Sequence, residues 1–338
     1  MEQKILKFFT SFFIILILFS SGCITQSNKG GAGGVIIESF KTDFNKVYAG
    51  EKFQIQMKMR NIGDVDAYNV YPKLYNIQIT QKDDLSISCK ESCKQGTRLL
   101  APDPERGIEG EERVCIWECT APENIPGGLS VTFNPSARLY YWYRAYVIKS
   151  VNIVSRNELR AIATQGGALS SETVESTKGP LLLDVVVRGP IKYQEEDNKV
   201  IFPININIEN VGNGVACVTK KITVPIPILG LKTWSPTSFN YVDLISGCEI
   251  KENWDKVAIF YGIEDPSIRI YDCEVTEDMM NGRIIDLWKG KTKTITCLVE
   301  VGISKETPSI LQKNLRFDLE YAYFIDATTS IEVLGKGY

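Results

Sequence analysis

The residues Glu51–Ala67, EKFQIQMKMRNIGDVDA, decide the fold, because their pattern occurs again at Val200–Ala216, VIFPININIENVGNGVA. In both copies apolar and polar residues alternate with a period of two, which predicts a strand with one face on a core and one in water. An Asn-x-Gly sequence, starting at Asn61 or Asn210, ends each strand and predicts a tight reversal. The chain therefore contains an internal repeat.

Each repeat closes on an aromatic strand, RLYYWYRAYVI at Arg138–Ile148 and LRFDLEYAYFI at Leu315–Ile325. Both faces of the first strand are largely apolar, so one face lies on the core and the other is either covered by the neighbouring domain or exposed. We expect it to be covered. If it is exposed, Tyr140, Trp142 and Tyr146 form a candidate binding surface for sugar or protein.

The fold class follows from the short strands, the regular turn residues and the lack of alternating strands and helices, which together predict an all-β protein. A chain of 338 residues is too long for one sandwich core. We expect antiparallel β-sandwiches at 37–160 and 180–338, the second with loop insertions, and a small, polar linker at 161–179.

The first 22 residues predict a targeting segment. Two lysines precede the apolar run Phe8–Phe19, which is shorter than the ~20 residues of a membrane-spanning helix but suits a signal peptide. Small residues before Cys23 resemble the lipobox of prokaryotic lipoproteins, in which cleavage precedes a cysteine that receives a lipid on its sulfur. An ordinary secretory signal or an uncleaved anchor is the alternative. The Gly-rich residues that follow Cys23 predict a flexible tether over 23–36.

Eight further cysteines, four in each repeat, favour disulfides in an oxidising compartment. The residue numbers of Cys89 and Cys119 have the same sum as those of Cys93 and Cys115, as in facing positions of an antiparallel pair. We therefore predict these two disulfides. The same C-x3-C spacing also suits a four-thiolate zinc site, which is the alternative.

For the cysteines of the second repeat the spacing leaves three connectivities open. We prefer Cys248 with Cys273 and Cys217 with Cys297. Because their number is even, no cysteine of this repeat is left unpaired in any of these connectivities.

These landmarks also support a resemblance. Ala49-Gly50-Glu51, the alternating strand, Asn-x-Gly, a later Pro-Gly or Lys-Gly turn and the closing aromatic strand are similar to the CARDB-type immunoglobulin-like domains. These domains are a cell-adhesion-related family of archaeal and bacterial surface proteins. The resemblance implies two tandem immunoglobulin-like β-sandwiches of about seven strands each. It implies display on the cell surface and brings no known chemistry, cofactor or metal.

Composition excludes several kinds of function. The chain has no histidine, so Ser-His-Asp, Cys-His and histidine-based metal sites are impossible. The net charge of −3 is scattered and provides no basic face for nucleic acid. We therefore predict that the protein is not an enzyme and binds no nucleic acid.

Two functions remain open. We expect a lipid-anchored structural or adhesive protein on the extracellular side of the cell membrane, in contact with envelope proteins or polysaccharide. The alternative is a lipoprotein that captures a ligand or polysaccharide in the inter-domain cleft or in the insertion at Val224–Cys248. A cleft lined by Trp234, Trp254 or Trp288 would favour capture, but we expect these residues to pack in the core.

Overall fold

The computed structural model describes residues 33–77, 85–91, 93, 96–194, 198–218, 241–262, 265, 267–273, 283–304 and 306–336. The expected signal peptide at 1–22, the lipidation site Cys23, most of the tether and Trp234 lie outside these residues. The chain divides into two units, Met1–Gly31 and Ala32–Tyr338, and the second contains every described element. No helix in the described part of the chain is long and apolar enough to cross a membrane.

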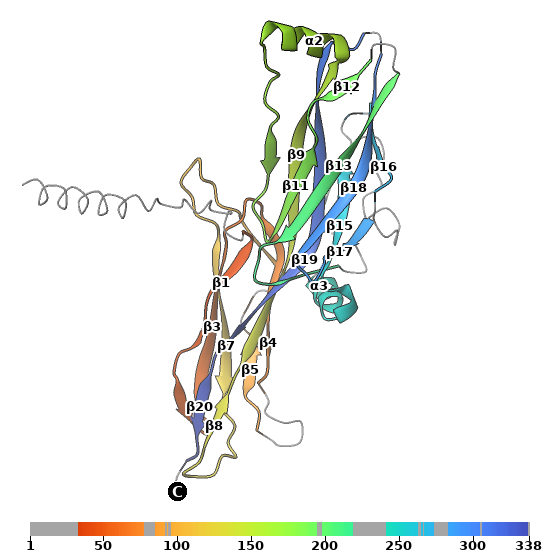
Figure 1. Cartoon of the computed structure of the whole chain (residues 1–338). Helices are drawn as coiled ribbons and strands as arrows, with labels where there is room; N and C mark the ends of the chain where they lie inside the picture. Colours follow the sequence, from red (N-terminus) through yellow and green to blue (C-terminus); the bar gives the residue numbers. More distant parts are fainter. Residues whose placement is uncertain are drawn as a thin grey trace, which may run out of the picture. The chain divides into compact units, whose positions relative to one another are not determined.

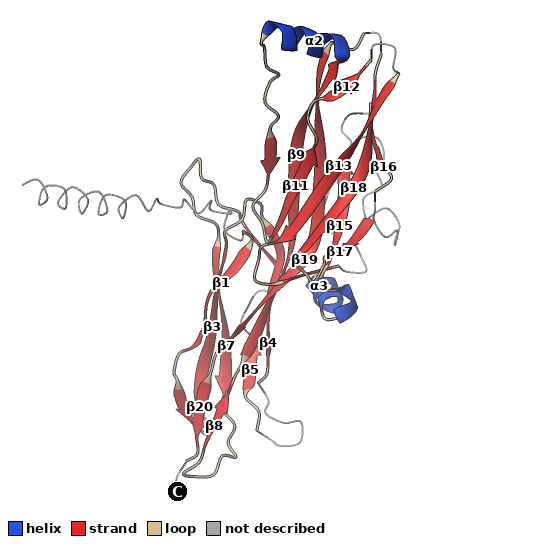
Figure 2. Cartoon of the chain, in the orientation of Figure 1, coloured by secondary structure: helices blue, strands red, loops and turns tan. Residues whose placement is uncertain are grey.

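The described elements confirm the all-β fold class, since nearly all are strands and most pair antiparallel (Figure 2). The strands are β1 Val35–Thr42, β2 Lys46–Tyr48, β3 Lys52–Asn61, β4 Ala67–Tyr75, β5 Ser88–Glu91, β6 Thr97–Leu99, β7 Glu112–Thr120, β8 Ser130–Phe133, β9 Ser136–Ser155, β10 Val174–Ser176, β11 Leu181–Val187, β12 Ile191–Tyr193, β13 Lys199–Asn210, β14 Val215–Cys217, β15 Lys256–Gly262, β16 Ile268–Tyr271, β17 Arg283–Asp286, β18 Thr292–Gly302, β19 Ile310–Thr328 and β20 Ile331–Leu334. The helices are α2 Arg156–Gln165, α3 Tyr241–Cys248 and the short 3-10 turn η2 Lys251–Asn253.

The repeated stretch forms the second strand of a four-stranded sheet in each half of the chain. The strand order is β1-β3-β7-β5 in the first half and β11-β13-β18-β16 in the second. The alternation predicted from the sequence is confirmed, since every second residue of β3 and β13 is buried: Phe53, Ile55, Met57, Met59, Phe202, Ile204, Ile206 and Ile208. The repeat in the sequence is therefore a repeat of sheet architecture.

The two closing aromatic strands, β9 and β19, pair with each other in a nine-stranded sheet of order β17-β15-β19-β9-β4-β6 (Figure 1). Their antiparallel register runs from Ser136 opposite Thr328 to Val154 opposite Ile310. The same register continues where β8 pairs with β20, with Phe133 opposite Ile331. One ladder therefore joins the two halves, although we expected these strands in separate sandwiches.

The Asn-x-Gly turn has the same construction in both halves. The Asn61 Oδ1 accepts a hydrogen bond from the Gly63 amide at 3.1 Å, and the Asn210 Oδ1 accepts one from the Gly212 amide at 3.2 Å. Both asparagines are buried. A Cβ on Gly63 would overlap the Tyr143 hydroxyl, and a Cβ on Gly212 would overlap that of Tyr323. Tyr143 and Tyr323 are therefore equivalent residues.

This equivalence shows how the halves are related. Tyr143 lies opposite Tyr321 in the ladder, and Tyr141 lies opposite Tyr323. The difference in residue number between Tyr143 and Tyr323 is the same as that between Tyr141 and Tyr321. A rotation that places Tyr143 on Tyr323 therefore places Tyr321 on Tyr141, so each ladder pair takes the position of the other. The halves are thus related by a pseudo-two-fold axis that passes between Trp142 and its partner Ala322. The four tyrosines pack in the core with ring centroids 5.7 to 6.2 Å apart.

Four disulfides stabilise the structure. Cys89 is bonded to Cys119 and Cys93 to Cys115, the pairing that the constant sum predicts. This pairing leaves no thiolate in the first set for the alternative zinc site.

The preferred pairing in the second half was wrong, because the structure joins Cys217 to Cys248 and Cys273 to Cys297. The physical reason is that Cys248 ends α3, which packs on β19, the strand that pairs with β14, while Cys273 follows edge strand β16 next to β18. The Cys273–Cys297 bond is similar to Cys89–Cys119, since each links the edge of a four-stranded sheet to the neighbouring strand, with Cα atoms 4.1 Å apart.

The stretch 161–179, expected as a linker, contains the end of α2 and strand β10, which pairs with β9. We predicted neither α2 nor α3. Helix α2 is capped at its N-terminus by Ser155, whose Oγ accepts a hydrogen bond from the Glu158 amide at 3.2 Å, and at its C-terminus by Gly166, which has a φ of 69°. Ser-x-x-Glu and a C-terminal glycine are helix boundary signals that the sequence already contained.

Candidate functional site

The candidate surface Tyr140, Trp142 and Tyr146 lies on the outer face of the nine-stranded sheet, but it is not an exposed row. Tyr140 is 0% exposed and Trp142 is 6% exposed, which contradicts a binding role for these two side chains. They pack in a second, smaller core with a partner from α3, Leu244. The expected coverage is therefore real, and it comes from helix α3, which lies within the neighbouring region 180–338.

Helix α3 is held over this face by covalent and polar contacts. The Cys217–Cys248 disulfide joins the helix to β14, which pairs with β19. The Trp254 indole donates a hydrogen bond to the Cys248 carbonyl at 2.6 Å, and its ring lies 5.3 Å from that of Phe324. Trp254 thus packs as expected.

Tyr146, the third member of the candidate surface, is half-buried and lines a hollow. This pocket has a volume of about 360 Å³. It lies where the loop after the first Asn-x-Gly turn meets β9 and β19, and its lining comprises Asp64, Val65, Asp66, Tyr68, Ala101, Arg144, Tyr146 and Arg316. The pocket therefore combines two aromatic rings with side chains of both charges.

The two arginines of the Tyr146 pocket are held by one buried carboxylate. Asp318 is 1% exposed, and its oxygens lie 3.0 Å from an Arg144 nitrogen and 3.2 Å from the Arg316 Nε. The Arg316 guanidinium lies 4.9 Å from the centre of the Tyr146 ring. Asp318 thus positions both cations, and burial makes its ion pairs less screened than those at the surface.

The remaining polar groups of this pocket are also committed. The Tyr146 hydroxyl donates to Glu175 at 3.1 Å, and burial, followed by this hydrogen bond, raises the pKa of Tyr146. Burial likewise raises the pKa of Tyr68. Both phenols are therefore neutral at physiological pH. Neutral aromatic rings beside fixed guanidinium and carboxylate groups can stack on and hydrogen-bond a polar ligand such as a sugar.

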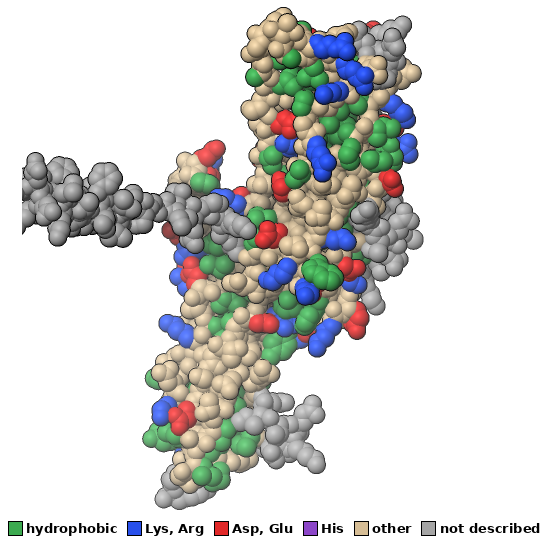
Figure 3. Space-filling view, in the orientation of Figure 1, with side chains coloured by type: hydrophobic (Ala, Val, Ile, Leu, Met, Phe, Trp, Pro, Cys, Tyr) green, Lys and Arg blue, Asp and Glu red, His purple; other side chains and the backbone are tan. Residues whose placement is uncertain are grey.

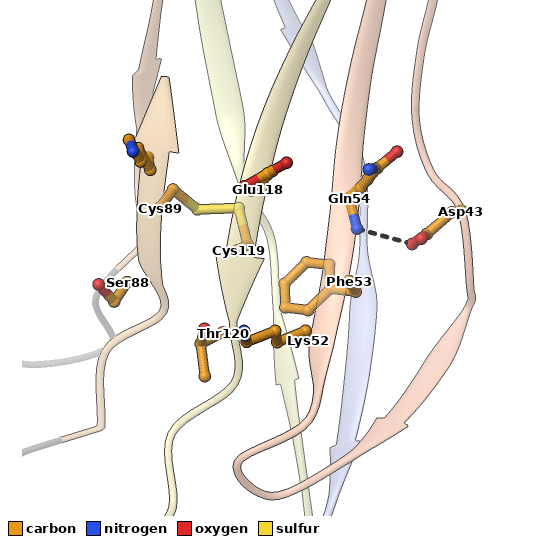
Figure 4. A pocket seen from close by; sticks show the side chains of 10 residues that line it. Asp43, Lys52, Phe53, Gln54, Ser88, Cys89, Glu118, Cys119 and Thr120 are labelled. Carbon is orange, nitrogen blue, oxygen red and sulfur yellow. Dashed lines mark hydrogen bonds between the residues drawn. A yellow bond between two sulfur atoms is a disulfide. The ribbon is translucent and has the colours of Figure 1, made fainter. Parts of the chain in front are cut away.

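A larger hollow of about 570 Å³ lies over β3, β5 and β7 (Figure 4). The Cys89–Cys119 disulfide crosses it, and Lys52 and Glu118 contribute opposite charges. The Asp43 Oδ1 accepts a hydrogen bond from the Gln54 amide at 2.9 Å, so this carboxylate holds the start of β3. Side chains of both charges line this hollow, so its charge favours no particular class of ligand.

Trp288 departs most from expectation, since its predicted core packing is wrong. It is 70% exposed. It stands on a turn between β17 and β18, where its amide donates to the Thr292 carbonyl at 2.7 Å and the Gly290 amide donates to the Leu287 carbonyl at 3.1 Å. Lys289 and Gly290 have φ angles of 51° and 66°. The Lys-Gly turn was recognised in the sequence, but the orientation of its tryptophan was not.

No cluster of His, Cys, Asp or Glu suited to a metal ion occurs in the part of the chain that the structure describes. No protein-family model matches the chain, and no curated protein shows significant similarity to it.

Among solved structures, the chain matches the secreted serine protease VesC from Vibrio cholerae, with 8% sequence identity and a TM-score of 0.19. The match covers 85% of this chain and 49% of that one, so the chain spans about half the length of VesC. A likeness this weak carries no argument about fold or activity. The matched protein is a protease, and the prediction that this chain is not an enzyme is withdrawn and not carried further.

Proposed function

We propose that this chain is a lipid-anchored protein of the cell surface with an adhesive or protein-interaction role. In this proposal Cys23 carries the lipid, residues 23–36 form the tether, and tandem immunoglobulin-like sandwiches of CARDB type form the body. The repeated four-stranded sheets and the four disulfides support this proposal, because disulfides persist in oxidising extracellular compartments.

The observation that carries the adhesive role is Trp288. Burying an indole that is 70% exposed would remove a large apolar area from water, and tryptophan is enriched at the energetic centres of protein interfaces. The hydrogen-bonded turn fixes the backbone beneath the ring, so little conformational entropy would be lost on binding. The Lys289 ammonium lies 5.5 Å from the ring centre and adds a positive charge beside it.

The test measures adhesion of cells that display the full chain to a surface coated with envelopes of the same organism. Trp288→Ala is expected to reduce adhesion at least fivefold. Phe44→Ala is the matched control, because Phe44 is an aromatic residue that is 56% exposed elsewhere in the chain. Equal adhesion of the wild type and Trp288→Ala, at equal surface amounts, would refute this role.

A second candidate function is the capture of a ligand or polysaccharide. The specific observation in its favour is the Tyr146 pocket, in which Asp318 positions two arginines beside aromatic rings. Capture predicts that a neutral oligosaccharide raises the melting temperature of the wild type, because a ligand that binds only the folded state stabilises it. The rise should be lost in Tyr146→Ala. A neutral glycan panel that produces no rise in the wild type would refute capture of a neutral glycan by the Tyr146 pocket.

A further inference from the structure

Helix α2 forms one wall of a hollow that neither proposed function uses. The hollow has a volume of about 410 Å³ and is lined by Arg156, Leu159, Arg160 and Ala163 of α2 and by Lys192 of β12. Helix and strand lie together because α2 starts where β9 ends, and β12 pairs with those last residues of β9. Three cations and two apolar side chains therefore converge at this place, which we term the α2 groove.

The lining residues of α2 share one face of the helix. Arg156, Leu159, Arg160 and Ala163 are spaced i, i+3, i+4 and i+7, which places them in one stripe. Glu158, two positions after Arg156, lies about 200° around the helix and so points away from this stripe. No residue of α2 is fully buried. The side chains of this stripe are therefore not fully buried against the sheets.

The cations of the α2 groove differ from most other arginines of the protein. Arg60, Arg138 and Arg144 each contact a carboxylate. Arg156 and Arg160, like Lys192, are exposed and form no ion pair within the described residues. In Figure 3, Lys and Arg side chains gather over α2 and β12. On a chain with a net charge of −3, such a local excess of positive charge among the residues that the structure describes favours an anionic partner.

We propose that the α2 groove binds an acidic polysaccharide through its carboxylate groups. Guanidinium groups bind carboxylates in bidentate fashion, and two arginines four positions apart on a helix are separated by about 6 Å along its axis. Leu159 and Ala163 lie beside them on the same face of the helix and offer an apolar floor for the C–H face of a sugar ring. The stripe has no aromatic residue to enter a bilayer, which argues against a membrane surface as the partner.

The experiment titrates the full chain in detergent with oligogalacturonate, a carboxylated oligosaccharide, by calorimetry. Arg156→Gln/Arg160→Gln is expected to weaken binding about tenfold or more, while Arg156→Lys/Arg160→Lys retains part of the affinity because lysine keeps the charge but not the bidentate fork. Raising the salt from 50 to 500 mM should also weaken wild-type binding, because the groove is exposed. Circular dichroism checks that each variant is folded.

A matched control removes two positive charges elsewhere. Lys41→Gln/Arg106→Gln alters exposed cations outside the α2 groove and should bind oligogalacturonate like the wild type. Equal weakening by both double variants would overturn the proposal, as would equal binding of neutral galactan or preferred binding of an acidic peptide or anionic vesicles. Trp288→Ala should leave this binding unchanged, so failure of the adhesive proposal is distinguishable from failure of this one.

Discussion

Asn210→Ala is expected to cause a large loss of stability, because one buried side chain joins four parts of the second half. Its Nδ2 donates to the Gly290 carbonyl at 3.0 Å and to the Gly214 carbonyl at 3.1 Å. Its Oδ1 accepts from the Gly212 amide at 3.2 Å and from the Tyr323 hydroxyl at 2.9 Å. The substitution removes all four hydrogen bonds at a buried site.

The size of this loss of stability depends on which hydrogen bonds the partners of Asn210 retain in the variant. The Gly212 amide still donates to the Pro180 carbonyl, and the Tyr323 hydroxyl still accepts from the Gly214 amide. The Gly290 and Gly214 carbonyls lose their contact with Asn210. With about 1 kcal/mol for each lost hydrogen bond and a further penalty for buried acceptors, Asn210→Ala should lower the free energy of unfolding by about 3 to 5 kcal/mol.

The assay is urea unfolding with the disulfides intact, followed by circular dichroism and tyrosine fluorescence. The matched control is Asn207→Ala, on the outer face of the same strand, where the Asn207 side chain accepts one exposed hydrogen bond from Thr294. The control should change the free energy of unfolding by less than about 0.5 kcal/mol. A loss below about 1 kcal/mol for Asn210→Ala would refute the role given to the Asn-x-Gly turn.

Three further predictions concern other parts of the fold. Gly63→Ala should lower the melting temperature, because its Cβ would overlap the Tyr143 hydroxyl, and the double variant with Tyr143→Phe should recover part of the loss; no recovery would place the strain elsewhere. Cys248→Ser should destabilise the protein by about 2 to 4 kcal/mol and red-shift tryptophan emission, since α3 loses its tether; unchanged emission would show that packing alone holds the helix. Hydrogen bonds from Lys313 and Ser267 lower the pKa of Asp265 to about 2, so its stabilisation is present above the unfolded value of about 3.9 and is lost as the pH falls toward 2. Lys313→Ala should reduce the dependence of the free energy of unfolding on pH over that range. An unchanged pH dependence would contradict the assignment of this stabilisation to Asp265 and Lys313.

The parts of the fold that the sequence predicts are those with a local signal. The period-two alternation of β3 and β13 is visible because one face of each strand is buried and the other is wet. The first disulfides were predictable because Cys89 and Cys119 occupy facing positions on β5 and β7, for which the sum of residue numbers is constant. Both signals depend on regular geometry within one sheet.

The pairing of β9 with β19 has no such local signal. Their partners are far apart in the sequence, and either strand could have closed its own sandwich with the same alternation. The second set of disulfides was missed for a related reason, because Cys248 lies in α3 and not on a strand. The constant sum of residue numbers applies only to cysteines on paired antiparallel strands, so it cannot predict such a bond.

The candidate site was predictable only in part. The apolar character of both faces of β9 correctly indicated a cover over Tyr140 and Trp142, but a helix from a distant insertion supplies it. For the α2 groove, the Ser155-x-x-Glu158 signal and two arginines four residues apart were present in the sequence. Their convergence with Lys192 depends on the parallel pairing of β12 with β9, which the sequence does not predict.

The most direct test of a disulfide-stabilised, lipid-anchored surface protein is the intact mass of the chain purified from its own membranes, before and after reduction and thiol alkylation. The proposal predicts a chain that starts at Cys23, carries acyl groups, and reacts with alkylating reagent at eight thiols only after reduction of four disulfides. A chain that retains residues 1–22, carries no lipid and has eight free thiols would contradict it.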